Sequence, residues 1–189
     1  MGLGGDPPLS VEIVFETHSL SVDNERGIAT GWLPGRLSEA GRRQAGALGA
    51  RRRDDGIAAV FTSDLARAVE TAEIAFPGTG IPVYRDARLR ECNYGVLNGM
   101  PRSQLDAVRL RHLDEPFPEG ESWRQAVERV GGFLDEVART RDGERVLVIG
   151  HGATRLALDH LANGVPLEDL VAAQFDWQEG WEYRFPPGR

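Results

Sequence analysis

Short apolar runs separated by polar segments are the strongest constraint on the fold of this chain. Runs at residues 11–16, 57–61 and 145–149 have the length of buried strands and are rich in valine and isoleucine, and a shorter run at 81–84 reads as a further strand. Strands that alternate with helices indicate a largely parallel sheet with helices on both faces. The sequence therefore predicts an α/β fold, a three-layer α/β/α sandwich with a mostly parallel central sheet and a small cap.

Helix signals fill the gaps between the strand-like runs. Ser38 is a typical N-cap, and Ser122 with Gln125 makes a capping box. We expect helices at about 38–53, 62–76 (capped by Thr62, Ser63 and Asp64), 101–111, 122–139 and 153–162, and one or two closing strands within 172–185.

The 189 residues contain no repeat and no linker that would divide them. We expect residues 1–9 to be a flexible tail and residues 10–189 to be one domain. Residues 92–120 are predicted to leave the core and form the small cap.

The composition excludes several classes of protein. The net charge is −7 and no basic cluster stands apart from acidic residues, which argues against nucleic acid as a partner. No apolar run approaches the roughly 18 residues that span a membrane, and the N-terminus lacks the features of a signal peptide. With a single cysteine, Cys92, no intramolecular disulfide can form, so the sequence favours the cytoplasm. The oligomeric state cannot be read from this sequence.

Two histidines, an arginine and a glutamate follow four of the predicted strands. His18, Arg67, Glu91 and His151 each lie shortly after the end of a different strand. Because ligands of open α/β sheets bind beyond the carboxyl ends of the strands, these side chains are expected to converge.

Two imidazoles, a guanidinium and a carboxylate suit phosphoryl transfer without a metal. One neutral imidazole can attack phosphorus, and a guanidinium can bind the phosphate oxygens. A protonated imidazole can stabilise the developing charge, and a carboxyl group can protonate the leaving oxygen and then activate water. The same residue types also leave open a metal site made of two histidines and a carboxylate.

Several segments of the chain together resemble the histidine phosphatase superfamily, in its phosphoglycerate-mutase-like branch. The resemblance extends from about Val11 to Ala162. It rests on His18 followed by Asn24, on Gly31-Trp32, and on residues 37–45 (LSEAGRRQA), 63–72 (SDLARAVETA), 89–99 (LRECNYGVLNG), 118–122 (PEGES) and 150–155 (GHGATR).

The resemblance implies a role for each of the strand-end residues. His18 would be the phosphate-accepting nucleophile, Arg67 would bind phosphate, His151 would stabilise charge and Glu91 would be the acid/base. Asn24 would line the pocket. The short cap resembles the phosphatases of the branch more than its mutases. The resemblance thus implies a metal-independent phosphomonoester hydrolase without a cofactor, acting on a small-molecule phosphoester.

The chain departs from the superfamily on both sides of His18. An arginine usually precedes the nucleophile and a glycine follows it, but here the neighbours are Thr17 and Ser19. Their hydroxyls can replace hydrogen bonds to a phosphate, which makes both candidate substrate-binding residues, but they supply no charge.

Three explanations of this departure remain open. In the first, another arginine enters the pocket. In the second, the substrate brings its own cation, and the enzyme is weak or narrowly specific. In the third, the chain is a catalytically impaired pseudophosphatase that binds a phosphorylated ligand. The candidate replacements are Arg26, Arg36, Arg90 and Arg102.

Overall fold

A computed structural model describes residues 10–186 of the chain. The expected flexible tail at residues 1–9 lies outside the described residues. The strands are β1 (Val11–Thr17), β2 (Ile28–Ala29), β3 (Ala59–Thr62), β4 (Val83–Arg85), β5 (Met100–Pro101), β6 (Arg145–Gly150) and β7 (Trp181–Phe185). The helices are α1 (Val22–Glu25), α2 (Glu39–Arg52), α3 (Ala66–Ala75), α4 (Arg102–Val108), α5 (Trp123–Thr140), α6 (Gly152–Asn163) and α7 (Leu167–Ala172), with 3₁₀ turns η1 (Ala87–Leu89), η2 (Gly95–Leu97) and η3 (Arg109–His112).

Five strands form the central sheet in the order β4-β3-β6-β1-β7. The first four strands run parallel, and β7 pairs antiparallel with β1 at one edge. The fold class predicted from the sequence is confirmed, with one closing strand. In the β1–β6 register Thr17 lies opposite Gly150, so the two strands end level with each other. His18 and His151 therefore leave the sheet side by side.

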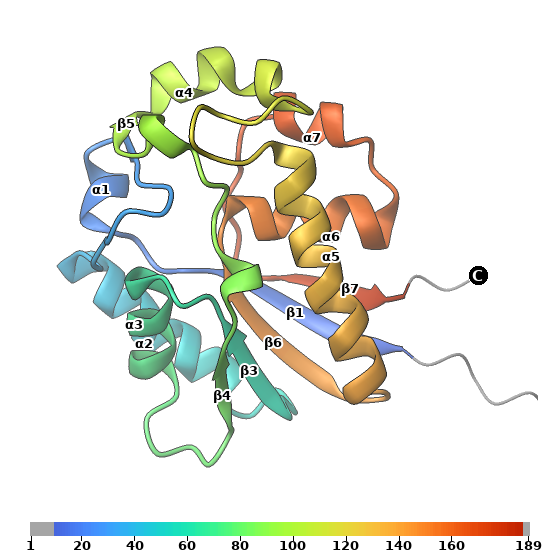
Figure 1. The fold of residues 1–189 in the computed structure, drawn as a ribbon. Coiled ribbons are helices and arrows are strands. Elements are labelled where there is room, and N and C mark those ends of the chain that lie inside the picture. Colours follow the sequence, from blue (N-terminus) through green and yellow to red (C-terminus); the bar gives the residue numbers. More distant parts are fainter. Residues whose placement is uncertain (1–9, 187–189) are drawn as a thin grey trace, which may run out of the picture.

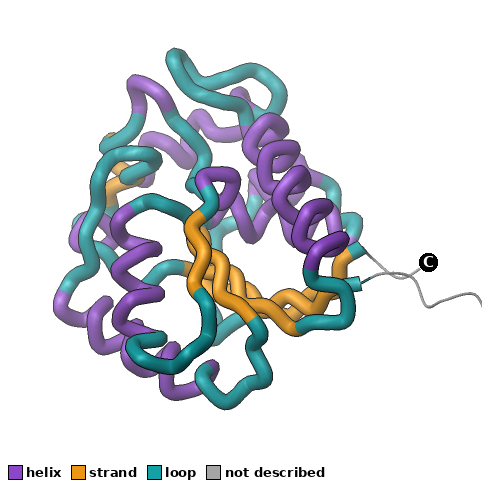
Figure 2. The backbone as a smooth tube through the Cα atoms, turned by 60° about the horizontal axis from the view of Figure 1, so that its bottom comes forward, coloured by secondary structure: helices purple, strands orange, loops and turns teal. Residues whose placement is uncertain are grey.

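Helices cover both faces of the sheet (Figure 1, Figure 2). Alternate residues of β1 point to opposite faces: Ile13 and Phe15 belong to one apolar cluster with residues of α5 and α6, whereas Val14 belongs to another with residues of α2 and α3. The strands are thus buried on both sides, which explains their nearly continuous apolar sequences.

Two of the three predicted helix caps agree with the structure and one was wrong. Ser38 caps α2, and Ser122 with Gln125 forms the capping box of α5. The helix after β3 was expected to be capped by residues 62–64, but Leu65 is the N-cap of α3 and makes no side-chain cap bond. Ser63 and Asp64 bond instead to His151 and Arg90, which belong to distant segments.

Segments around the cap contain elements that the sequence did not predict. The strand expected at 81–84 is β4, which starts two residues later than predicted. The structure also contains α1, α7 and the small β2–β5 sheet, which were not predicted. The helical pattern at 101–111 is divided into α4 and η3. The backbone N–H of Arg102 donates to the carbonyl of Gly27 at 2.7 Å, which ties the start of α4 to the loop after α1.

Residues 92–120 were expected to form a cap, and they contain η2, β5, α4 and η3. In Figure 1, α4 lies at the top, beyond the strand ends and near α7. None of the helices within residues 10–186 is long and apolar enough to cross a membrane.

Candidate active site

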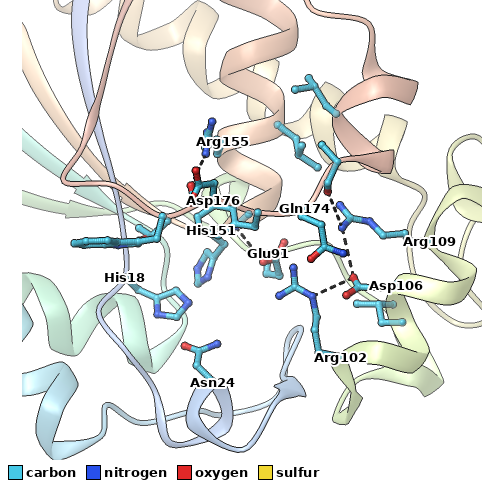
Figure 3. Close-up of a pocket in the computed structure, with 18 of the residues that line it drawn as sticks. His18, Asn24, Glu91, Arg102, Asp106, Arg109, His151, Arg155, Gln174 and Asp176 are labelled. Carbon is cyan, nitrogen blue, oxygen red and sulfur yellow. Dashed lines mark hydrogen bonds and ion pairs between the residues drawn. The ribbon is translucent and has the colours of Figure 1, made fainter.

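A cavity of about 380 Å³ lies beyond the ends of β1 and β6. Its walls come from these strand ends, α1 and the residues just before it, the cap, α6 and the segment after α7 (Figure 3). The polar and charged side chains that line it are Thr17, His18, Asn24, Gln44, Glu91, Tyr94, Arg102, Asp106, Arg109, Trp123, His151, Arg155, Asp159, Gln174, Asp176 and Trp177.

His18 is held in one tautomer by its neighbours. Its backbone N–H donates to the carbonyl of Gly150 at 2.9 Å, and its Nδ1–H donates to the carbonyl of Ser19 at 2.8 Å. A neutral imidazole that donates from Nδ1 carries its lone pair on Nε2. The Nε–H of Arg67 donates to that Nε2 at 3.3 Å. The free electron pair of His18 therefore points at the guanidinium that would hold a phosphate.

Arg67 connects the two strand-end histidines. It lies in the first turn of α3 and is 2% exposed. One terminal nitrogen, Nη2, donates to the carbonyl of Gly31 at 2.9 Å and to His151 Nδ1 at 3.3 Å, while the buried Nη1 has no partner within the described part of the chain. A buried donor without a partner is costly, so Nη1 is available for an oxygen of a bound ligand.

His151 forms the N-cap of α6 and is almost fully buried. Since Nδ1 accepts from Arg67, the neutral ring carries its proton on Nε2, which lies 2.6 Å from the hydroxyl oxygen of Ser63. The centres of the His18 and His151 rings are 5.0 Å apart. Arg67 therefore fixes the tautomer of the His151 ring, and Ser63 helps to fix its orientation toward the predicted nucleophile.

Burial keeps both imidazoles neutral. Removal from water and then the charge of Arg67 lower the pKa of His18 to about 3, although the bond to the Ser19 carbonyl raises it. The same causes, with a smaller contribution from His18, lower the pKa of His151 well below its usual range. His18, the predicted nucleophile, is therefore unprotonated at neutral pH without an arginine at position 17.

Glu91 is oriented by three backbone donors. Its Oε1 accepts from the N–H groups of Cys92 at 2.8 Å and Ala153 at 3.0 Å, and its Oε2 accepts from Gly152 at 3.1 Å. Two of these donors belong to the first turn of α6, where unpaired N–H groups favour a carboxylate. The carboxylate therefore lines the cavity in a fixed orientation beside His151.

The backbone of Glu91 is fixed as well. Its carbonyl accepts from Trp32 Nε1 at 2.6 Å and from Arg129 at 3.3 Å. Arg129 also donates to the carbonyls of Arg88 and Arg90. The segment that carries Glu91 is irregular, and these bonds hold it in place.

The residues predicted to bind substrate lie in two environments. Thr17 and Asn24 line the cavity, and the Asn24 amide oxygen also accepts from Ser21 in the capping box of α1. Ser19 is buried, is not among the cavity-lining residues, and its N–H donates to the hydroxyl oxygen of Thr71. The catalytic and binding roles of all these residues stay predictions.

Arginines from the cap and from α6 also reach the cavity. Of the four candidate replacements for the missing arginine, Arg102 lines the cavity, whereas Arg90 pairs with Asp64 beside the Trp32 ring. Arg109 and Arg155 line it too, which the sequence analysis missed. Arg109 follows Arg102 by seven residues, a spacing that places two helical residues on one face.

Metal ligands are not grouped in the described structure. Within residues 10–186, no cluster of three histidine, cysteine, aspartate or glutamate side chains is arranged to hold a metal ion.

Comparison with known proteins identifies the family. Residues 13–179 match the sequence profile of the histidine phosphatase superfamily (branch 1). The chain belongs to this superfamily. A 2,3-bisphosphoglycerate-dependent phosphoglycerate mutase from Methylobacterium sp. (strain 4-46) is 34% identical, over 84% of this chain and 83% of that protein. The resemblance found in the sequence is thereby confirmed.

Solved structures of the superfamily have the same fold. YhfR from Bacillus stearothermophilus is 29% identical with a TM-score of 0.78, covering 89% of this chain and 88% of that one. A mycobacterial glucosyl-3-phosphoglycerate phosphatase complexed with VO3 is 27% identical with a TM-score of 0.76, covering 86% and 87%. The relatives thus include mutases and phosphatases, which supports a phosphoryl-transfer enzyme.

Proposed function

We propose that this protein is a phosphomonoester hydrolase that works through a phosphohistidine on His18 and requires no metal or cofactor. The observation that carries the proposal is the tautomer of His18. Its Nδ1 donates to a carbonyl and its Nε2 faces Arg67, so the nucleophilic nitrogen is unprotonated and aligned with a cation.

The first step transfers the phosphoryl group to the enzyme. Glu91 takes up a proton when the substrate binds. His18 Nε2 then attacks phosphorus, the bond from phosphorus to the leaving oxygen breaks, and Glu91 delivers its proton to that oxygen. Arg67 binds the phosphoryl oxygens through Nη1 and through the Nε–H that it now gives to His18. His151, bonded to Ser63 through Nε2, lies opposite. The negative charge of a bound phosphoryl group would raise the pKa of His151, and the ring, once it has taken a proton from the substrate or water, donates to the transferring group.

The second step returns the enzyme to its starting state. Glu91 takes a proton from water, the water oxygen attacks phosphorus, and the bond to His18 Nε2 breaks to release inorganic phosphate.

Hydrolysis is favoured over mutase chemistry by the size of the cap. Only residues 92–122 lie between Glu91 and the start of α5, and the cap takes up 92–120 of them. A mutase must retain its intermediate to rephosphorylate it, which a short cap and a cavity lined by exposed residues such as Trp177 do not favour.

Thr17 supports a second candidate, a pseudophosphatase that binds a phosphorylated ligand. Without an arginine there, the phosphate loses charge-assisted bonds that contribute about 1.5–3 kcal/mol each. The intact arrangement of His18, Arg67, Glu91 and His151 favours the enzyme.

An assay on a broad panel of phosphomonoesters, with and without chelator and beside His18→Ala, tests the proposal. We expect release of inorganic phosphate that resists chelator and is lost in the variant. Phosphorus NMR of the products distinguishes hydrolysis from transfer to a second molecule. Binding without turnover would support the pseudophosphatase, and turnover abolished by chelator would support a metal site.

The substrate we propose is a small phosphoester, because the cavity is closed by the cap on one side. Cys92 is buried and free, which fits the proposed cytoplasmic location.

A further inference from the structure

Glu91 lies in a segment without regular structure. Residues 90–94 connect η1 to η2 and belong to none of the helices or strands described within residues 10–186. A general acid must nevertheless lie within hydrogen-bond reach of the oxygen that it protonates. Contacts from other parts of the chain must therefore fix the segment that carries the proposed acid.

Arg129, on α5, supplies most of these contacts. Its Nη1 donates to the carbonyl of Arg88 at 2.6 Å and to that of Arg90 at 3.1 Å, and its Nη2 donates to the carbonyl of Glu91 at 3.3 Å. Backbone carbonyls outside helices and strands need such donors from side chains. One guanidinium group therefore holds three carbonyls within four consecutive residues.

Glu121 fixes the guanidinium group in turn. Its Oε1 accepts from Arg129 Nη2 at 2.5 Å and its Oε2 from Nε at 3.2 Å, and the two side chains are 16% and 18% exposed. A bidentate pair of this kind sets the plane of the guanidinium group. Glu121 Oε1 also accepts from the N–H of Asn93 at 3.0 Å. The pair therefore holds the backbone on both sides of Glu91.

Trp32 holds the same carbonyl from a different loop. Its Nε1 donates to the Glu91 carbonyl at 2.6 Å, and the guanidinium carbons of Arg90 and Arg129 lie 4.6 Å and 5.9 Å from its ring centre. The Glu91 carbonyl thus has two donors from two distant segments. We call Arg129, Glu121 and Trp32 the clamp.

The place of the Glu91 carboxylate depends on this backbone. Two of the N–H groups that bind it, those of Gly152 and Ala153, belong to α6 and do not move with residues 90–94. A methyl group on Gly152 would lie 3.3 Å from Glu91 Oε2, so the carboxylate fits closely against the first turn of α6. A shift of the Glu91 backbone would therefore break these bonds and move the carboxylate away from His151.

The clamp acts from outside the cavity. None of its three side chains is among the residues that line the cavity, and Arg129 bonds to the carbonyl of Glu91 rather than to its carboxylate. Arg129 and Glu121 also neutralise each other. Neither contact with the substrate nor net charge accounts for the clamp, whereas control of the Glu91 backbone does.

We infer that Arg129 is a positioning residue, which with Glu121 and Trp32 holds the Glu91 carboxylate where it can protonate the leaving oxygen. The inference rests on the proposed function and extends it to residues that do not touch the substrate.

Two substrates that differ in their need for an acid test the inference. The alkoxide of glycerol 3-phosphate needs a proton to leave, whereas the anion of 2,4-dinitrophenyl phosphate leaves without one. In Arg129→Met we expect kcat/KM to fall about 10- to 100-fold for glycerol 3-phosphate and less than about threefold for 2,4-dinitrophenyl phosphate. Glu91→Gln should show the same selectivity with a larger loss.

Two further variants separate positioning from folding. Arg129→Lys keeps a charge beside Glu121 but cannot donate to three carbonyls and a carboxylate at once, so it should show the same selective loss. Arg124→Met is the matched control, because Arg124 lies on α5, is exposed and pairs with Asp114, and it should leave both substrates unaffected. Equal losses for the two substrates in Arg129→Lys, with the selective loss present in Glu91→Gln, would overturn the inference.

Amide hydrogen exchange tests the positioning without turnover. The amide hydrogens of Gly152 and Ala153, which bind the Glu91 carboxylate, should exchange about tenfold faster in Arg129→Lys, as they should in Glu91→Ala. The amide of Arg155, bonded to the His151 carbonyl, is the internal control and should not change. Unchanged exchange at Gly152 and Ala153 in Arg129→Lys would refute the inference even if phosphatase activity were present. Faster exchange confined to these amides would support it even if no hydrolysis were found.

Discussion

The Nε–H of Arg67 donates to His18 Nε2 at 3.3 Å, so the proposed nucleophile and the proposed phosphate ligand already contact each other in the ligand-free site. A phosphoryl group bound between them would exchange this bond for bonds to its own oxygens. The charge of Arg67 is also the second cause, after burial, of the low pKa of His18.

Replacing Arg67 should impair binding and raise the pKa of the nucleophile. Arg67→Gln removes the bonds to both histidines and the positive charge, so kcat/KM should fall by about 10²–10⁴. NMR titration should find the pKa of His18 closer to its ordinary value than in the wild type. Arg85→Gln is the control, because Arg85 is exposed and pairs with Glu73. An unchanged titration in Arg67→Gln would contradict the proposed electrostatic role.

Ser63 should act on the reaction through His151. Ser63→Ala removes the partner of His151 Nε2 and frees the ring to change its orientation, whereas the bond from Arg67 to Nδ1 keeps its tautomer. We expect kcat to fall about tenfold with KM little changed, as for a lost hydrogen bond of about 1–1.5 kcal/mol. Nitrogen NMR of the imidazole should detect the loss of the hydrogen bond at Nε2. Ser63→Thr keeps the hydroxyl and should retain more activity, and equal activity of the two variants would argue against this role.

Thr17 should limit the affinity for phosphate. Thr17 lines the cavity next to His18, and Thr17→Arg would add the charge that the superfamily usually has there. We expect orthovanadate and inorganic phosphate to bind about 10- to 100-fold more tightly to Thr17→Arg. Thr17→Ala removes the hydroxyl without adding a charge, and it should change the affinity for both anions by less than about fivefold. Weaker binding to Thr17→Arg would mean that the site is already complete, with Arg102 as the leading candidate for the missing cation.

Burial of His18 in its neutral form should make the fold sensitive to acid. The pKa of His18 is about 3 in the folded chain, whereas its ordinary value of 6.5 applies to the unfolded chain. As the pH falls, the unfolded chain therefore binds the proton first. The free energy of unfolding should therefore decrease as the pH falls from about 6.5 towards 3. Above about pH 6.5 His18 is neutral in both states and should contribute no pH dependence. In His18→Ala the slope should be smaller by up to about 1.4 kcal/mol per pH unit, measured by urea unfolding. Identical slopes in the two proteins would show that His18 is not buried neutral.

The sequence predicted the site where strand order determines it. His18 and His151 follow strands that the apolar runs identify, and the parallel register brings them together whatever the surrounding loops do. Glu91 was expected at the same edge because it follows the strand predicted at 81–84, but strand order does not determine how its side chain points. Its orientation depends on donors from α6, about 60 residues away, and on Trp32, and local sequence contains neither.

Other parts of the site depend on contacts that local sequence does not contain. Ser63 and Asp64 look like helix caps, and their tertiary partners His151 and Arg90 override that local preference. Arg109 becomes part of the cavity because it packs on Trp123 and bonds to the carbonyl of Ala173, a residue 64 positions further along the chain. No periodicity or motif reports such a contact.

The most direct test of the account is capture of the phosphorylated enzyme. Rapid mixing of the protein with a hydrolysed substrate, quenching in alkali and peptide mass spectrometry locate any phosphoryl group. The account predicts one phosphoryl group on the peptide that contains His18, absent from His18→Ala. A phosphoryl group on another residue, or hydrolysis that continues at the wild-type rate in His18→Ala, would contradict it.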